Sequence, residues 1–207
     1  MIKHNSAIVV FLKSPSSRYK KTRLAAELGQ EDASRVYEIL VKKILKLIDN
    51  IDLADKWISL SAMEEEDLKW FYSQNTFEKG WKFFEQKGQC IGERMHNTFS
   101  YLSQFYSRTL IVGGDIVDIS VDDLIVAFNC LEDCKDVVVG PSSDGGFWCL
   151  GLCRPIQNLF KGIDWSTDNV FLHLKKNVKL LGLRIRTVTT RRDIDTCYDI
   201  GMTTLLS

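Results

Sequence analysis

The sequence predicts an α/β fold, a three-layer αβα sandwich in which helices cover both faces of a mostly parallel, mixed sheet. Short apolar runs rich in β-branched residues alternate with longer segments whose apolar residues recur at every third or fourth position. The 207 residues suffice for one domain with a sizeable core, and no internal repeat, low-complexity tract or Pro/Gly linker interrupts them. We therefore expect a single domain over residues 1–207.

The first half of the chain contains three expected strands and two helices. The opening strand is Ala7–Leu12, which is apolar and β-branched, and the helix after it covers residues 33–48, where apolar side chains recur at helical spacing. A second strand is expected at Trp57–Leu60, a helix at Glu64–Tyr72 and a short edge-like strand at Trp81–Phe84. The chain thus opens with a strand–loop–helix unit of the kind that builds parallel sheets.

The second half continues the alternation. An amphipathic stripe from Ile91 to Tyr106 predicts a helix, and its members Phe99, Leu102, Phe105 and Tyr106 are assigned to the core because aromatic residues at helical spacing are usually packed. The later elements are strand Thr109–Val112, helix Val121–Leu131, strands Asp136–Val139 and Phe147–Leu152, helix Thr167–Leu180, strand Leu183–Val188 and a last helix from about Thr196.

Charges balance along the chain, with 27 Lys plus Arg and 27 Asp plus Glu. No overall field attracts nucleic acid or anionic lipid, so neither is expected as a partner, and any phosphate affinity must be local. No segment is long and apolar enough to cross a membrane, and the run Ala7–Leu12 is too short for the apolar region of a signal peptide. We expect a cytoplasmic protein without membrane insertion.

The six cysteines do not predict a metal site. Cys149 and Cys153 fall on one expected strand, where a spacing of four residues holds two side chains about 13 Å apart. Cys130 and Cys134 could meet on a helix, but two thiols are half of a zinc site. We expect free, mostly buried thiols in a reducing compartment.

The motif Gly113-Gly114-Asp115-Ile116-Val117-Asp118 directly follows the expected strand Thr109–Val112. In open α/β sheets, ligands bind outside the carboxyl ends of the strands, so a carboxylate at this place is a candidate metal ligand. An Asp after a strand is also a common turn former or helix N-cap, and the motif alone does not separate these interpretations.

A basic loop follows the first strand, at the same sheet end as Asp115. The segment Lys13–Leu24 combines five cationic side chains and several hydroxyls ahead of the first long helix, where backbone amides favour an anion. It contains neither the Walker A pattern nor G-x-G-x-x-G, which disfavours P-loop NTPases and dinucleotide dehydrogenases. A phosphate clamp is the functional interpretation, and a solvated basic loop is the alternative.

Two further acidic turns are expected at this edge. The segment Gly140–Gly146 joins two apolar strands and is a hairpin by default, yet its glycines would let a ligand approach the backbone and Asp144 would project beside Asp115. The turn Arg191–Thr196 carries Asp195, which could be a second ligand of a divalent ion or a cap of the last helix.

These segments together resemble a bacterial family, DUF2064, of proteins similar to GT-A glycosyltransferases. This family lies in the nucleotide-diphospho-sugar transferase superfamily, beside the molybdopterin-cofactor guanylyltransferases. The resemblance extends over nearly the whole chain in collinear order. Its motifs are Phe11–Pro15 with Lys21–Leu24, Gln86–Gly88 with Gly92–Met95, Gly113–Asp118, Gly140–Pro141 with Asp144–Phe147, Trp165–Asp168, and Asp193–Thr196.

The resemblance implies a GT-A sheet that grips a nucleotide diphosphate through a divalent cation, Mg or Mn. Asp115 matches the metal-site carboxylate of the family, and Asp195 falls where related enzymes supply a second ligand. Lys21 and Arg23 match the family's phosphate contacts. The other positions implied for substrate or phosphate binding are Lys13, Thr22, Arg94, Gly113, Gly114, Gly145, Gly146, Trp165, Ser166 and Thr167.

Asp144 and Asp168 are the candidate catalytic residues for positioning or deprotonating an acceptor hydroxyl, Asp144 being the first choice. Transfer from a nucleotide-sugar expels a nucleoside diphosphate and transfer of a nucleotide expels pyrophosphate, so either leaving group gathers negative charge. Carboxylate-held Mg or Mn, with Lys and Arg on the phosphates, would stabilise that charge.

The chain departs from the family pattern at two places. Members commonly have Pro-Gly where this chain has Ser17-Arg18, and Thr-Asp-Cys-Pro-Asp where it has Gly114–Asp118. The absence of that Pro and Gly changes how stiffly the first loop is held.

Three functions remain open from the sequence: a metal-dependent glycosyltransferase with an unknown small-molecule acceptor, a nucleotidyltransferase that activates a small phosphorylated molecule, and a non-catalytic nucleotide-binding protein. Nucleotidyltransferases of this fold usually have a Gly-rich first loop. This chain has no glycine between Met1 and Gly29, which favours sugar transfer. The sequence leaves open whether the protein is a homodimer.

Overall fold

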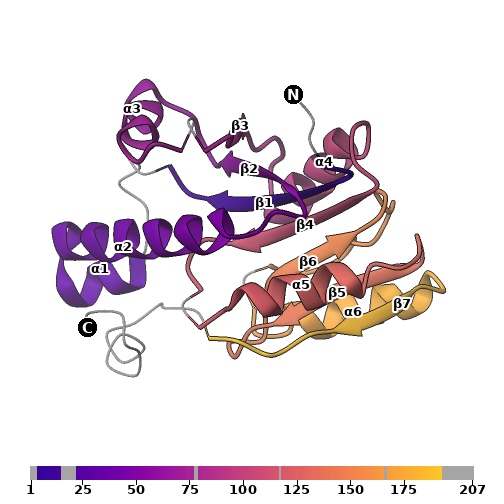
Figure 1. Cartoon of the computed structure of the whole chain (residues 1–207). Helices are drawn as coiled ribbons and strands as arrows, with labels where there is room; N and C mark the ends of the chain where they lie inside the picture. Colours follow the sequence, from indigo (N-terminus) through magenta and orange to yellow (C-terminus); the bar gives the residue numbers. More distant parts are fainter. Residues whose placement is uncertain (1–3, 15–21, 77–78, 117, 166, 193–207) are drawn as a thin grey trace.

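The computed structural model describes residues 4–14, 22–76, 79–116, 118–165 and 167–192, which contain a seven-stranded sheet with helices on both faces (Figure 1). The strands are β1 (Ser6–Leu12), β2 (Asp55–Leu60), β3 (Lys82–Glu85), β4 (Arg108–Gly113), β5 (Asp136–Pro141), β6 (Phe147–Leu152) and β7 (Arg184–Thr187). The helices are α1 (Thr22–Leu28), α2 (Gln30–Asp49), α3 (Glu65–Ser73), α4 (Ile91–Leu102), α5 (Val121–Asn129) and α6 (Val170–Leu180).

The strand order is β3-β2-β1-β4-β6-β5-β7. Neighbouring strands are parallel except where β6 lies between β4 and β5, antiparallel to both. Two consequences matter for the site. The carboxyl ends of β1, β4 and β5 and the amino end of β6 meet at one edge of the sheet. The chain also builds outward from β1 in one direction to β3 and in the other through β4, which makes the gap between β1 and β4 a topological switch point.

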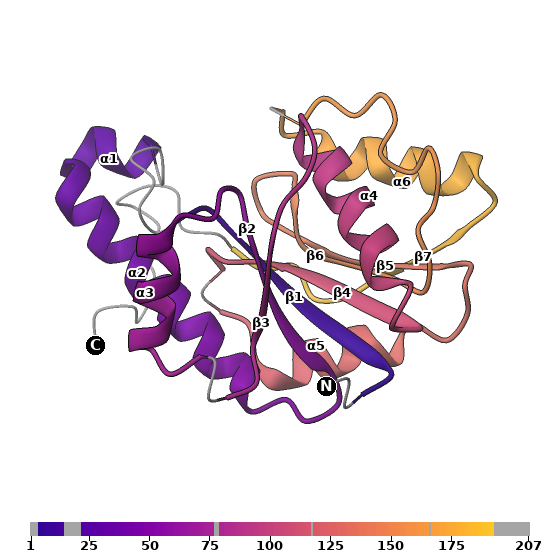
Figure 2. The same ribbon diagram turned by 90° about the horizontal axis from the view of Figure 1, so that it is seen from above.

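Both faces of the sheet are covered. Helices α2, α3 and α5 pack on one face, in a core that includes Tyr37, Phe71 and Phe128, and α4 and α6 pack on the other, in a core that includes Phe99 and Leu174 (Figure 2). Within β1, alternate residues enter the two cores, because successive side chains of a strand point to opposite faces. This accounts for the continuous apolar runs of the central strands.

The predicted α/β fold and mostly parallel, mixed sheet are confirmed, and most predicted elements lie within a few residues of their expected bounds. The predicted edge strand Trp81–Phe84 is β3, at one edge of the sheet. The predicted last helix from about Thr196 lies outside the described residues. None of the described helices is long and apolar enough to span a membrane.

Three details of the prediction are wrong. Helix α1, which was not predicted, follows the first loop and packs on α2 through Leu24. It is separate from α2 because Gly29, at φ 84°, interrupts the helix between them. The helix of the second stripe ends at Leu102, and Phe105 beyond it is 43% exposed instead of belonging to the core. The third error concerns the cysteines.

The thiols are free, as predicted for the five cysteines in the described segments, but they are not mostly buried. Cys149, on β6, is buried, whereas Cys90 and Cys134 are exposed. Cys90 is the N-cap of α4 and Cys134 lies in the turn before β5, and both places face solvent instead of the core.

Carboxylates near the amino ends of the strands have structural roles. Asp136, fully buried at the start of β5, accepts hydrogen bonds from Arg184 Nε at 2.9 Å and Arg186 Nε at 3.3 Å. Asp55, at the start of β2, accepts from Lys82 Nζ at 2.7 Å and from the Tyr106 hydroxyl at 2.9 Å. These groups tie outer strands to the sheet at the edge opposite the switch point.

Candidate functional site

A cleft opens at the switch point, where β1 and β4 end. Its two cavities, of about 290 Å³ and about 230 Å³, share the lining residues Phe11, Ile91, Gly113 and Asp115. Phe11 and Gly113 are register partners in the β1–β4 ladder, so the shared wall is built where the two strands part. We call the larger cavity the basic lobe and the smaller one the aromatic lobe.

The basic lobe contains the cationic side chains that line the cleft in the part of the chain that the structure describes. Lys13, directly after β1, and Arg94, on α4, line it with Tyr37 and Gln86. Tyr37 donates a hydrogen bond of 2.8 Å to the Lys13 carbonyl. Burial raises the pKa of Tyr37 far above its usual value, and the charge of Asp115 raises it further, so this hydroxyl remains a donor.

Contacts between side chains and the backbone shape the same lobe. Gln86 donates to the Ser59 carbonyl at 2.8 Å and fixes the end of β2. A Cβ on Gly114 would lie 2.1 Å from Leu12 Cδ2 and 3.3 Å from the Phe11 carbonyl oxygen, so a larger residue would displace the buried Leu12 side chain where the β4 loop passes β1. Arg94 Nε donates to the Gly88 carbonyl at 3.1 Å, which orients its guanidinium.

The start of the first loop is anchored to α3. The buried Ser14 donates a hydrogen bond of 2.6 Å to Asp67 Oδ2, and Asp67 also accepts from the Glu64 amide at 3.1 Å in the capping box of α3. Lys13 therefore has a neighbour on each side whose position is fixed by the fold.

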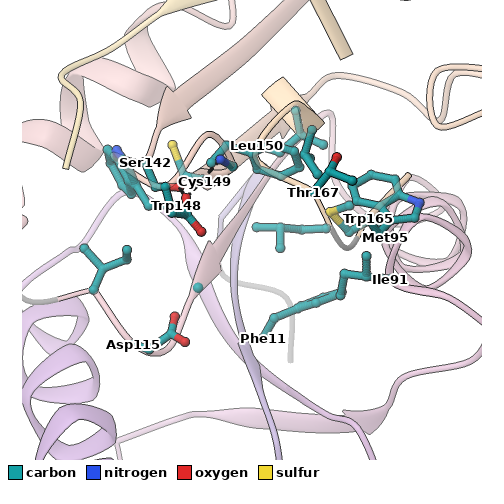
Figure 3. Close-up of a pocket in the computed structure, with 17 residues that line it drawn as sticks. Phe11, Ile91, Met95, Asp115, Ser142, Trp148, Cys149, Leu150, Trp165 and Thr167 are labelled. Carbon is teal, nitrogen blue, oxygen red and sulfur yellow. Dashed lines mark hydrogen bonds between the residues drawn. The ribbon is translucent and has the colours of Figure 1, made fainter. Parts of the chain in front are cut away.

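Asp115 is the acidic residue that both lobes share. It is half-buried in the loop after β4, and Figure 3 shows it across the aromatic lobe from Trp165. Asp118, later in the same loop, is exposed and lines neither lobe. Among the described residues no group of three or more His, Cys, Asp or Glu side chains could hold a metal, and the second predicted ligand, Asp195, lies outside them.

The turn between β5 and β6 supplies the other carboxylate of the aromatic lobe. Asp144 Oδ1 accepts hydrogen bonds from Ser142 Oγ at 2.5 Å and from the Gly146 amide at 2.9 Å. With Oδ1 held by two donors, the carboxylate has a defined orientation and its second oxygen can accept from a ligand. The turn is thus both the predicted hairpin and part of a cavity.

This turn lies directly on the segment that precedes α6. Gly145 has φ 87°, and a Cβ there would lie 1.8 Å from the Asp168 carbonyl oxygen. The Phe171 amide donates to the Gly145 carbonyl at 2.9 Å. The close approach holds the two walls of the aromatic lobe together.

Trp165 is held in the opposite wall. Its ring lies against Gly92 of α4, where a Cβ would come within 2.5 Å of it. It also contacts Phe147 and Phe160, with ring centroids 6.4 Å and 6.1 Å away. Thr167 lines the lobe beside it, whereas Asp168 is exposed, lines neither lobe and bonds to Asn169.

An ion pair between Arg191 and Asp123 supports the β5–β6 turn of the aromatic lobe. Arg191 donates to both carboxylate oxygens of Asp123, each at 2.7 Å. Burial alone would raise the pKa of Asp123, but hydrogen bonds from Arg191 and Ser120 outweigh it and lower that pKa. The Arg191 backbone bonds to Pro141 and Ser143, so α5 holds the turn that carries Asp144.

The cleft brings together most of the predicted site residues that the structure describes. Gly145 and Asp168 support or adjoin the cleft without lining it. Lys21, Ser166 and Asp195 lie outside the described residues, and Thr22 and Arg23 belong to α1 with side chains that are not described. Those that line the cleft are Lys13, Arg94, Gly113, Gly114, Asp115, Asp144, Gly146, Trp165 and Thr167.

Several lining residues were not predicted. Ser142 could have been found from its Ser-x-Asp spacing to Asp144, which is typical of side chains that bond within a turn. Tyr37 and Met95 belong to amphipathic stripes whose apolar residues also form the core, so no local signal marks them. Trp148 reaches the lobe because Gly140 leaves room for its ring.

The chain matches the family profile DUF2064, described as "uncharacterized protein conserved in bacteria", over residues 46–167. The match includes the loops of Asp115 and Asp144 and excludes the first loop and residues 193–196. No curated protein sequence shows significant similarity to the chain.

Solved structures share the fold. A "putative nucleotide-diphospho-sugar transferase" from Desulfovibrio desulfuricans G20 is 26% identical, with 97% of this chain and 86% of that chain covered and a TM-score of 0.85. The mannosyltransferase PcManGT from Pyrobaculum calidifontis, in complex with GDP-Man and Mn2+, is 10% identical, with coverage of 91% and 56% and a TM-score of 0.57.

A synthase has a structural similarity to this chain close to that of the mannosyltransferase. The 4-diphosphocytidyl-2C-methyl-D-erythritol synthase from Anaerococcus prevotii DSM 20548 is 11% identical, with coverage of 96% and 94% and a TM-score of 0.58. At these identities the mannosyltransferase and the synthase show the fold alone. The chain has the GT-A-like fold of nucleotide-diphospho-sugar transferases.

Proposed function

The chain belongs to the DUF2064 family, and we propose that it is a metal-dependent glycosyltransferase that uses a nucleotide-linked sugar as donor. One observation carries this proposal. Asp115 lies where a lobe with two cations joins a lobe with aromatic walls and a second carboxylate. A donor diphosphate suits the first lobe and an acceptor hydroxyl suits the second. The bond between the donor sugar and its diphosphate, which breaks in the reaction, would therefore lie near Asp115.

The basic lobe fits the diphosphate of the donor. Lys13 and Arg94 supply two positive charges, and the backbone at Gly113 and Gly114 can be approached closely. The family resemblance adds Lys21 and Arg23 on the phosphate oxygens.

The donor set near Asp115 fits a hard divalent cation. Mg²⁺ in proteins is commonly bound by one or two carboxylates together with substrate phosphates, so Asp115 and a donor diphosphate supply suitable ligands. Two sulfur atoms line the aromatic lobe, the thioether of Met95 and the thiol of Cys149. A thioether is a soft ligand that does not suit Mg²⁺, and burial raises the pKa of the Cys149 thiol far above its usual value, so this thiol stays protonated. Bound Mg²⁺ or Mn²⁺ would offset the negative charge that gathers on the departing diphosphate.

Asp144 is the group we propose to act on the acceptor. The acceptor oxygen forms a bond to the anomeric carbon of the donor sugar as the bond from that carbon to the diphosphate breaks. The nucleoside diphosphate leaves with the electron pair, and the acceptor proton passes to Asp144. Ser142 and the Gly146 amide orient the carboxylate for this step.

Nucleotidyl transfer is the competing function, and the fold does not separate the two. The first loop favours sugar transfer, because it has no glycine before Gly29, whereas nucleotidyltransferases of this fold usually hold a triphosphate on a Gly-rich backbone there. The aromatic lobe agrees, since a sugar ring can pack on Trp165 and Phe147.

Thermal shifts with nucleoside mono-, di- and triphosphates and sugar nucleotides, each with and without manganese, test the proposal. A ligand at about 100 times its Kd stabilises a protein by about 2.7 kcal/mol, which corresponds to roughly 5–10 °C at this size. We expect such a shift with a sugar nucleotide plus manganese, and its loss in Asp115→Asn but not in the matched variant Asp118→Asn. A shift confined to triphosphates would indicate nucleotidyl transfer instead, and equal behaviour of the two variants would refute the role of Asp115.

A further inference from the structure

Trp165 is a wall between two cavities. Trp165 lines the aromatic lobe, and it also lines a separate hollow of about 550 Å³ on the outer side of α4. That volume falls within the range of about 300–1,000 Å³ that is typical of ligand pockets. We call it the outer hollow. Its lining residues include Glu93, Asn97, Gln157, Asn158, Phe160 and Lys161.

The helix α4 serves both cavities because it presents two adjacent faces. Ile91 and Met95, four residues apart, line the aromatic lobe. Glu93, His96 and Asn97, also at helical spacing, line the outer hollow. The first two turns of α4 therefore form a partition, and Trp165, which lines both cavities, lies at its edge.

The position of Trp165 is fixed. Gly92 leaves no side chain between the helix and the ring, and Phe147 and Phe160 contact the ring from the two cavities. A rigid aromatic ring binds a ligand without the entropy cost of ordering a mobile side chain.

The chemistry of the outer hollow differs from that of the basic lobe. Its polar lining is mostly neutral, with the amides of Asn97, Gln157 and Asn158, each of which can donate and accept hydrogen bonds. Among the described residues that line it, the carboxylate is Glu93, which already accepts from the Gln89 amide at 2.8 Å, and the lysine is Lys161. Charges of opposite sign with net zero do not select a phosphate.

Amide groups beside aromatic rings suit a molecule with hydroxyls around its rim and C–H groups on its faces. The faces of a pyranose ring can pack on Trp165 and Phe160, while its hydroxyls exchange hydrogen bonds with the amides. The asparagine at position 97 has one amide hydrogen engaged by the Lys87 carbonyl at 2.8 Å, which orients its oxygen.

We propose that the outer hollow is a second acceptor subsite that takes a neutral, polyhydroxylated unit such as a sugar residue. This inference rests on the proposed function, because it places the reacting acceptor hydroxyl beside Asp144 in the aromatic lobe. The acceptor passes the edge of Trp165 and sets its next unit in the outer hollow. The acceptor is then a neutral glycan or glycoside of two or more units, not a small phosphorylated molecule.

The test uses the full chain, fluorescently labelled, on a printed array of neutral mono-, di- and oligosaccharides with phosphorylated and sulfated counterparts. Calorimetric titration then gives the Kd of each hit for the wild type, Gln157→Ala, His96→Ala and the matched control Gln104→Ala, which is exposed beyond α4. We expect neutral glycans of two or more rings to bind. Gln157→Ala should weaken them about three- to tenfold, as expected for the loss of one hydrogen bond, and Gln104→Ala should not.

Three outcomes would overturn the inference: no neutral glycan bound, binding confined to phosphorylated or sulfated glycans, or unchanged Kd values in both hollow variants. Titration of the same preparations with UDP and manganese separates this failure from that of the proposed function. Nucleotide binding without glycan binding removes the subsite alone. Glycan binding that depends on Gln157, without nucleotide binding, removes the donor assignment and leaves the hollow as a glycan site.

Discussion

Replacing Gly145 by alanine is expected to separate the two walls of the aromatic lobe. The residue has φ 87°, and a left-handed conformation costs a residue with a Cβ roughly 1–2 kcal/mol. The new Cβ would also lie 1.8 Å from the Asp168 carbonyl oxygen, which is backbone and cannot swing away. The turn must therefore withdraw and lose the hydrogen bond from the Phe171 amide, worth about 0.5–1.5 kcal/mol.

The strained backbone, the broken hydrogen bond and the looser packing of the parted walls together cost about 2–4 kcal/mol, or a fall in Tm of roughly 5–15 °C for a chain of this size. The matched control is Gly80→Ala, because Gly80 has φ 81° but a Cβ there would meet nothing within 4 Å. Urea and thermal unfolding followed by circular dichroism measure both variants. Equal losses of stability would show that the close approach to Asp168 is not part of the fold, since backbone conformation alone would then explain Gly145→Ala.

Three other changes have distinct expected results. Arg94→Met should weaken nucleoside diphosphate binding about tenfold or more in calorimetric titrations and leave nucleoside binding unchanged, because in the proposed binding mode the lost charged donor, which lines the basic lobe, faces the phosphates. Ser142→Ala should lower turnover about tenfold at unchanged donor affinity, since Asp144 Oδ1 keeps a single donor, the Gly146 amide. Asp136→Asn should cost about 1.5–3 kcal/mol in urea unfolding at neutral pH, because two arginines lose a charged acceptor.

The arginine and serine tests have matched controls. Arg35→Met changes an exposed arginine that pairs with Glu31 on α2, and it should leave nucleotide binding intact. Ser143→Ala alters the exposed neighbour of Ser142. If the paired variants behave alike, the assigned contact is not the cause.

The effect of Asp136 depends on pH. Hydrogen bonds from Arg184 are the largest cause that lowers the pKa of Asp136 below its usual value, and burial opposes them. A lowered pKa in the folded state stabilises the protein above the unfolded value of about 3.9, and this stabilisation is lost as the pH falls through the folded pKa. The stability gap between wild type and Asp136→Asn should therefore be largest near neutral pH and shrink below about pH 4. A gap that does not change with pH would contradict this reasoning.

The sequence by itself determined the succession of strands and helices and the acidic and basic loops that follow the strands. These are local properties: apolar spacing in Ala7–Leu12 and along α2 reports which face of an element is covered, and that pattern needs no knowledge of its neighbours. Because parallel strands end at a common edge, the chain order alone also predicts that the loops of Lys13 and Asp115 lie together.

Tertiary structure alone decided which side chains meet. The antiparallel insertion of β6 between β4 and β5 places the turn of Asp144 across from Asp115, and the approach of that turn to residues 167–171 leaves Asp168 outside the cleft. From the sequence alone, Gly92 is a residue that destabilises a helix, yet in the fold its missing side chain makes room for the ring of Trp165. Such convergence depends on strand order and on packing between residues far apart in the chain, which periodicity and spacing do not encode.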